Sequence, residues 1–139
     1  MYSDLLKNKQ QRFKHEYEKE NVLSLRRNMQ KTYSICENGL FKYLYNKGRS
    51  FVHPYFIIYC KDNKKDFNRI GITVSKKIGN SVKRNRAKRV LKEAYRIIEN
   101  EVATGYDFIF VARSKTPFIS MNIIKKDMFN TFKKNNFLK

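Results

Sequence analysis

Hydrophobic and polar positions divide the chain into a weakly patterned N-terminal part and a strongly patterned remainder. Through residues 1–33, apolar residues are sparse and follow only an irregular helical rhythm. From Ser34 onward they recur at the spacings typical of helices and strands. We therefore predict a basic N-terminal extension over residues 1–33, partly disordered or helical, and a single folded domain over residues 34–139.

Three helices are predicted in this domain. The first runs from Ser34 until Gly48 interrupts it, as a glycine often does just past a helix C-terminus. The second spans residues 82–100, with Ser81 as its N-cap, and the third follows Ser120. The apolar stripe of the second helix consists of Ala87, Val90, Leu91, Ala94, Ile97 and Ile98. The inward face of the third consists of Ile123, Ile124, Met128, Phe129 and Phe132.

Three strands are predicted, over residues 55–61, 69–75 and 107–112. The first two flank a polar, charged turn, which indicates a hairpin. The third is apolar at successive positions and is therefore predicted to be buried on both faces. Gly71 in the second strand would leave room for another backbone or a ligand to approach.

The composition indicates a polyanionic partner. The 139 residues carry a formal net charge of +19, from 31 Lys and Arg against 12 Asp and Glu. So large an excess raises self-repulsion unless an anion neutralises it. No apolar run approaches the roughly 18 residues that span a bilayer, and the N-terminus lacks a secretory signal. We expect a soluble, cytoplasmic protein without a membrane partner.

The two cysteines do not indicate a metal site. Cys36 and Cys60 form no CxxC pair, and only two histidines supplement them. We predict free thiols with packing roles and no metal bound by the protein.

Basic residues are concentrated in one predicted helix and the turn before it. Between Lys76 and Arg96, nine of 21 residues are Lys or Arg, and Glu93 is the only acid. A solvated charged face is the ordinary interpretation of such a run. However, cations in the first turns of a helix are unfavourable by roughly 0.3–1 kcal/mol each. Their presence here favours binding of phosphates in a folded RNA backbone.

The same segment resembles a known signature. SKKIGNSVKRNRAKR, residues 75–89, is similar to the bacterial ribonuclease P protein, whose hallmark is an Arg-Asn-Arg element after a Lys-Lys-x-Gly-Asn turn. Residues 40–48 (LFKYLYNKG) are similar to that family's first helix, and the resemblance covers about residues 34–137. It implies an α+β fold, an α/β sandwich with a mixed four-stranded sheet. It also implies a left-handed βαβ crossover, as in domain 2 of ribosomal protein S5.

The resemblance also implies a function as the protein subunit of ribonuclease P. In that family the RNA subunit is the catalyst, and the enzyme is an endoribonuclease that removes the 5′ leader of precursor tRNA and leaves a 5′-phosphate. The implied partners are the catalytic RNA, with one protein per RNA, and precursor tRNA. The implied cofactor is Mg²⁺ bound mainly by the RNA, and no residue of this chain is expected to be catalytic.

Two sets of binding residues follow from the resemblance. The residues expected to bind the catalytic RNA are Lys76, Lys77, Asn80, Lys83, Arg84, Asn85, Arg86 and Arg89. Those expected to bind the leader are Phe41, Tyr45, Tyr59, Lys88 and Lys92. Family members usually have two phenylalanines in the first helix, so Tyr45 is a departure that keeps a ring. Phe41 also has an alternative role in the core, because aromatic residues pack readily.

Two other functions remain open from the sequence. A nuclease acting without RNA would need gathered acids or a histidine pair, whereas the acids here are scattered over different elements. A structural RNA-binding protein of ribosomal type would share the basic helix. Dependence on the tRNA leader would distinguish it from the ribonuclease P subunit.

Overall fold

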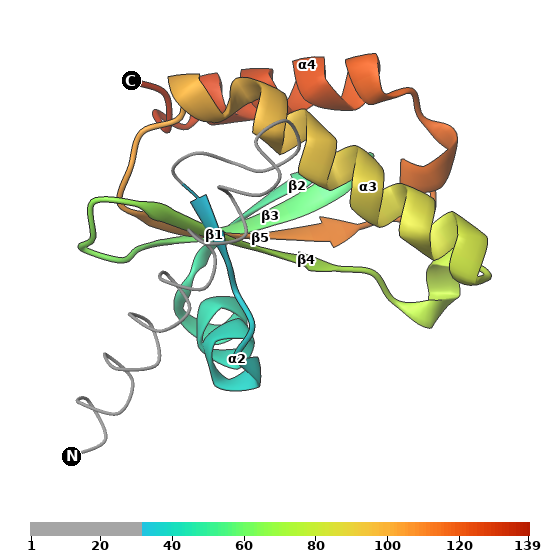
Figure 1. The fold of residues 1–139 in the computed structure, drawn as a ribbon, viewed down its shortest axis with the longest axis horizontal. Helices are drawn as coiled ribbons and strands as arrows, with labels where there is room; N and C mark the ends of the chain where they lie inside the picture. Colours follow the sequence, from blue (N-terminus) through green and yellow to red (C-terminus); the bar gives the residue numbers. More distant parts are fainter. Residues whose placement is uncertain (1–31) are drawn as a thin grey trace, which may run out of the picture.

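The computed structural model describes residues 32–139, which form a sheet covered by helices on both faces (Figure 1). The strands are β1 (Thr32–Ser34), β2 (Arg49–His53), β3 (Phe56–Asp62), β4 (Asn68–Thr73) and β5 (Tyr106–Ala112). The helices are α2 (Asn38–Lys47), α3 (Ser81–Ile98) and α4 (Met121–Lys134), with short 3₁₀ helices η1 (Lys76–Ile78), η2 (Glu99–Glu101) and η3 (Thr116–Phe118). The predicted extension lies outside the described residues except for Thr32 and Tyr33, which belong to β1.

The sheet is mixed, as predicted, but it has five strands instead of four, in the order β1-β4-β5-β3-β2. β1 and β5 run parallel to β4, whereas β3 is antiparallel to both β2 and β5. The two strands that the sequence did not indicate lie at the sheet edges. β1 has only three residues and β2 is mostly exposed, so neither has the alternating apolar pattern of a half-buried strand.

The predicted hairpin between residues 55–61 and 69–75 is wrong. β3 and β4 do not pair, because β5 lies between them and pairs with both. β5 is almost wholly buried, and a strand that is apolar on both faces is most stable at the centre of a sheet. The actual hairpin joins β2 to β3 through the turn at Pro54 and Tyr55.

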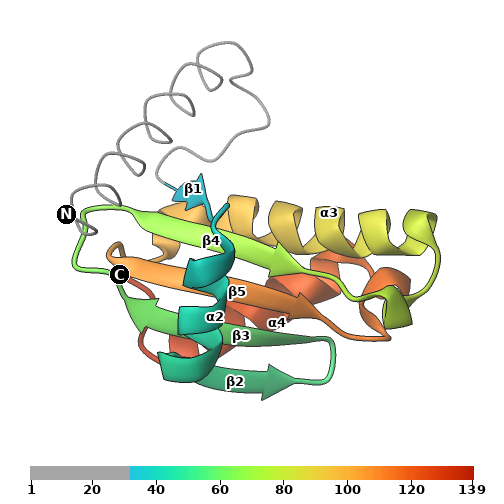
Figure 2. The same cartoon turned by 90° about the horizontal axis from the view of Figure 1, so that it is seen from below.

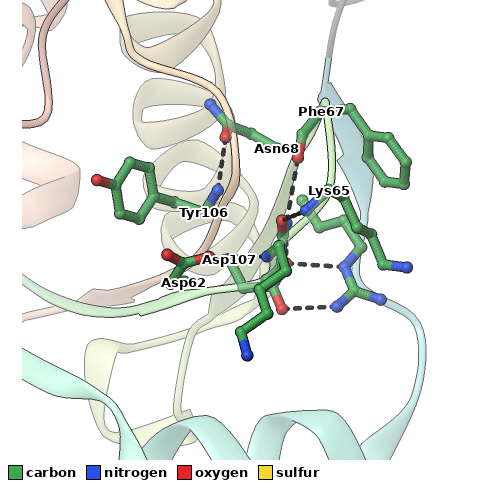
Figure 3. Close-up of polar contacts among 9 residues, drawn as sticks. Asp62, Lys65, Phe67, Asn68, Tyr106 and Asp107 are labelled. Carbon is green, nitrogen blue, oxygen red and sulfur yellow. Dashed lines mark hydrogen bonds and ion pairs between the residues drawn. The ribbon is translucent and has the colours of Figure 1, made fainter.

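A partly buried polar network holds the connection from β3 to β4 (Figure 3). The Arg69 guanidinium donates two hydrogen bonds of 2.7 Å to the carboxylate of Asp107 on β5. Asn63 in the connection donates to the same carboxylate at 3.0 Å and to the Phe67 carbonyl at 3.1 Å. The Asn68 side chain accepts from the Tyr106 backbone N–H at 2.9 Å. These contacts tie the β3–β4 connection to Tyr106 and Asp107 at the start of β5. β5 therefore lies between β3 and β4, and the two strands do not form a hairpin with each other.

The crossover from β4 through α3 to β5 is left-handed. In Figure 2 both strands point to the right, β5 lies below β4, and α3 runs behind the sheet. Seen from the helix side with the strands pointing up, β5 therefore lies to the left of β4. About 98% of such connections are right-handed, so this feature confirms the topology that the resemblance implied.

Side chains alternate between two cores, one on each face of the sheet. Phe108 and Phe110 of β5 point to the large core under α3 and α4, whereas Ile109 points to a smaller core under α2. Figure 1 shows α2 alone on one face and the other two helices on the opposite face. The architecture is therefore the predicted α/β sandwich.

The predicted helices are present, but the first begins at Asn38 and not at Ser34, which is the last residue of β1. The other differences are at caps and faces. Asn80, not Ser81, caps α3, because its side chain accepts a 3.0 Å hydrogen bond from the Lys83 N–H. Tyr95 completes the buried stripe of α3, and Ile97 is exposed. The Tyr95 hydroxyl is bonded to Thr32 and Asn68, which explains how a polar residue fits the buried face. Ser120 caps α4 as predicted, and Ile123 is exposed.

Candidate nucleic-acid interface

A groove of about 530 Å³ opens beside β4, between α2 and the first turns of α3. Its lining residues are Asn38, Phe41, Tyr45, Ile72, Thr73, Val74, Ser81, Arg84, Asn85 and Lys88. β1 pairs only with Asn68–Ile70, so no described strand continues along the outer edge of β4 beyond that point. The groove therefore forms where the sheet edge becomes open.

One wall of the groove is aromatic. The Phe41 ring lies over Gly71, where an added Cβ would be 2.6 Å from the ring Cζ. The Tyr45 hydroxyl is hydrogen-bonded to the Thr73 hydroxyl at 2.6 Å, and the Tyr45 ring meets the Tyr59 ring edge-on at 4.9 Å. The space that the sequence predicted above Gly71 is therefore filled by the Phe41 side chain. Phe41 and Tyr45 present adjacent rings to the groove.

Phe41 combines a contact with the small core and a position in the groove lining. It packs against the small core of Ile35, Leu44 and Ile109, and it also lines the groove. Tyr59 packs on the same core but does not line the groove, so it supports Tyr45 from behind. A core contact fixes the orientation of the Phe41 ring, which suits a rigid stacking surface.

The opposite wall is cationic and comes from α3. Arg84, Asn85 and Lys88 line it, and no acid lies in the first turn of this helix. Arg84 is half-buried, and its Nε is buried without a hydrogen-bond partner among the described residues. Lys92 lies one turn beyond Lys88 on the same flank of α3, outside the groove lining. The positive charge of this wall therefore faces the groove without a neutralising acid in the first turn of α3.

A second group of predicted residues lies on the other flank of α3. The Arg86 Nε donates to the Pro117 carbonyl at 2.7 Å, and the Lys83 Nζ lies 5.3 Å from the centre of the Phe118 ring. Arg89 is exposed between the two flanks, and Lys76 and Lys77 are exposed on η1. Arg84 and Arg86, which belong to the same predicted RNA-binding set, thus lie on different flanks of α3, as the 100° spacing of helical residues requires.

Among the groove residues, the sequence did not single out Asn38, Ile72, Thr73, Val74 or Ser81 for binding, and it did not single out Phe118. Ile72 and Thr73 lie in a predicted strand, and their place at the groove depends on where β1 ends. Asn38 and Ser81 lie in the first turns of their helices, where a capping or solvated role is the ordinary expectation. Only the open edge of β4, a tertiary feature, brings them together.

The two thiols differ in environment. Cys60 is buried in the large core, and burial raises the pKa of its thiol to about 12. Cys36 is exposed, so the predicted packing role holds only for Cys60. Within residues 32–139, no group of three or more His, Cys, Asp or Glu side chains is arranged to hold a metal ion. Across the same residues, every helix is too short or too polar to cross a membrane.

Comparisons with known proteins agree on one family. A family model described as Ribonuclease P matches residues 29–136. The ribonuclease P protein component of Clostridioides difficile is 38% identical over 105 residues, which cover 75% of this chain and 92% of that protein. That of Alkaliphilus metalliredigens is 47% identical over 85 residues, covering 61% of this chain and 77% of that protein.

Solved structures lead to the same family. The structure of the Staphylococcus aureus RNase P protein superimposes with a TM-score of 0.69 at 31% identity, covering 77% of this chain and 98% of that one. The RNase P protein from Thermotoga maritima gives a TM-score of 0.62 at 26% identity, covering 68% and 89%.

Proposed function

Because the chain belongs to the ribonuclease P protein family, we propose that it binds the 5′ leader of precursor tRNA while assembled with the catalytic RNA. In this role it promotes endonucleolytic removal of the leader to give the mature tRNA 5′ end. The observation that carries the proposal is the groove beside β4, which has aromatic rings on one wall and cations on the other. Precursor tRNA is processed in the bacterial cytoplasm, where the proposal places the protein.

The groove has the chemistry of a single-strand binding site. Proteins grip such strands with a positive groove that follows the phosphates and with rings on which bases stack, worth about 1–3 kcal/mol per base. Phe41 and Tyr45 supply the rings, and Arg84 and Lys88 supply the charge. We assign Tyr59 to the support of Tyr45, and Lys92 to a leader phosphate beyond the groove.

The outer surface of α3 and the turn before it are assigned to the catalytic RNA. Lys76, Lys77, Lys83 and Arg89 are exposed there and have no acidic neighbour in the first turn of α3. Asn80 and Asn85 add amide groups that can donate to phosphates and accept from ribose hydroxyls. Arg84 faces the groove, and we place it where leader and catalytic RNA meet.

We propose that cleavage itself is carried out by the RNA with its bound Mg²⁺. Residues 32–139 contain no group of three or more His, Cys, Asp or Glu side chains arranged to hold a metal ion, and the proposal assigns the ion to the RNA. The protein's contribution is to position the leader and to neutralise phosphate charge, with one protein per RNA. Neutralising phosphates lowers the repulsion between substrate and catalytic RNA.

The assembly proposal is tested by cleavage of a 5′-labelled precursor tRNA at low Mg²⁺ by a bacterial ribonuclease P RNA. We expect strong stimulation by this protein and no cleavage when the RNA is omitted. Cleavage by the protein alone would indicate a nuclease, and no effect of the protein would favour the ribosomal type of RNA-binding protein.

The leader proposal is tested by the double substitution F41A/Y45A. Each stacking contact is worth about 1–3 kcal/mol, so binding of precursor tRNA to the holoenzyme should weaken at least tenfold. Binding of mature tRNA should change little. The matched control is Tyr43→Phe, an exposed ring on the same helix that does not line the groove. Equal losses for both tRNAs would show that the two rings act only through the core.

A further inference from the structure

Phe118 on η3 is the most exposed phenylalanine among the described residues. Its side chain is 67% exposed, although an apolar ring is normally buried. Val82 on α3 is also exposed, at 70%. Neither residue lines the groove. The groove assignment therefore does not explain this aromatic surface.

The loop that carries Phe118 is held rigidly. The Thr116 hydroxyl donates to the Tyr55 carbonyl at 2.6 Å and accepts from the Arg113 N–H at 2.8 Å. Thr116 and Pro117 are buried, and the Phe118 N–H donates to the Lys115 carbonyl at 3.0 Å. The ring is thus presented in a fixed position, which lowers the entropy lost when a partner binds it.

Two cations of α3 lie close to the Phe118 ring. The Lys83 ammonium lies over one face of the ring, 5.3 Å from its centre, and the Arg86 Nε donates to the Pro117 carbonyl at 2.7 Å. The remaining guanidinium nitrogens of Arg86 stay available for a phosphate. A base can stack on the ring face that Lys83 does not cover, with the two cations close enough to meet its phosphates.

We propose that Phe118 is a stacking platform for one unpaired base of the catalytic RNA, with Lys83 and Arg86 on the flanking phosphates. This inference rests on the proposed function and extends the RNA surface from α3 to η3. Phe118 and Arg86 lie on the flank of α3 opposite Arg84 and Lys88. The base therefore belongs to the catalytic RNA and not to the leader in the groove.

The test measures binding of the full-length protein to a bacterial ribonuclease P RNA as a function of salt. F118A and F118L should bind roughly 5- to 150-fold more weakly, the range given by 1–3 kcal/mol for one stacked base. F118Y, which keeps the ring, should bind within about threefold of the wild type. The salt slope should not change in any of these variants, because no cation is removed. The control is V52A, a 71% exposed residue on the opposite edge strand β2.

Base-specific chemical probing provides a second readout. One unpaired RNA base should be protected in the wild-type complex and reactive in the F118A complex. Binding of F118A or F118L as tight as wild type would overturn the inference, and so would F118Y as weak as F118A. Failure of the wild-type protein itself to bind the RNA would overturn the proposed function and this inference together.

Discussion

Gly71 and Phe41 form the contact that positions the aromatic wall of the groove. The ring lies so close to the Gly71 backbone that a Cβ there would approach its Cζ and Cε1 to 2.6 and 2.7 Å. These atoms are at the far end of a side chain, which moves more readily than backbone. A methyl group at position 71 would therefore displace the ring and leave the strand in place.

We predict that Gly71→Ala weakens binding of precursor tRNA by the holoenzyme severalfold while binding of mature tRNA is kept. Displacing the ring by overpacking should lower the free energy of unfolding by only about 1 kcal/mol, at the low end for such changes. Equilibrium binding of both tRNAs and urea unfolding would measure the two effects. The matched control is Gly39→Ala on α2, where nothing lies within 4 Å of an added Cβ. If Gly39→Ala also weakened binding of precursor tRNA, displacement of the Phe41 ring could not be the cause of the loss.

The two cysteines provide a second test at the level of single residues, which concerns the burial of Cys60 in the core. Cys36 is exposed, whereas Cys60 is buried and its thiol pKa is raised to about 12 by burial. Alkylation proceeds through the thiolate, so at pH 8 Cys36 should react rapidly and Cys60 only after unfolding in urea. Mass spectrometry of the labelled peptides would show this. Equal labelling rates in the native protein would contradict the buried position of Cys60.

The basic helix α3 carries, within one sequence element, the two surfaces that we propose bind RNA. Its groove flank carries Arg84 and Lys88, and its other flank carries Lys83 and Arg86. The 100° spacing of helical residues predicts that Arg84 and Arg86 lie on different flanks. It does not show what each flank faces, because η3 and the open edge of β4 come from distant parts of the chain.

We predict that Arg84→Ala weakens binding to the catalytic RNA and reduces the slope of log K against log salt. Each phosphate contact that is lost should remove about 0.7–0.9 from the slope, because fewer counterions are released. Arg86→Ala should have the same electrostatic effect and should also loosen η3, since its bond to Pro117 is lost. Lys126→Ala on α4 is the control, an exposed cation outside both flanks. An unchanged slope for Arg84→Ala would exclude this residue from the RNA interface.

At the level of elements, periodic segments could be predicted and short edge segments could not. The stripe of α3 and the buried strand β5 were recognised because burial imposes a regular apolar pattern over many residues. β1 is too short for such a pattern, and its place depends on pairing with β4. The pairing of β3 with β5 was also missed, since the hairpin prediction assumed that neighbours in sequence are neighbours in the sheet.

For the whole molecule, net charge and handedness have different origins. The charge of +19 is visible in the sequence and indicates a polyanion directly. The left-handed crossover depends on how α3 packs against the sheet, and local patterns carry no sign of it. Only the resemblance to the family implied this crossover, and the same crossover places α3 beside the groove.

We expect the groove to bind anions, so anions that fit it should stabilise the protein beyond the general screening of its excess positive charge. We predict that millimolar pyrophosphate, at constant ionic strength set by sodium chloride, raises the free energy of unfolding. The gain should approach about 2.7 kcal/mol at 100 times the dissociation constant, because the ligand binds only the folded state. In the double variant R84A/K88A the gain should shrink, since two cations of the groove wall are removed.

Denaturant unfolding with and without pyrophosphate measures both values. Equal stabilisation by sodium chloride alone, or an undiminished gain in the double variant, would mean that general screening of the +19 charges is responsible and not a site on α3.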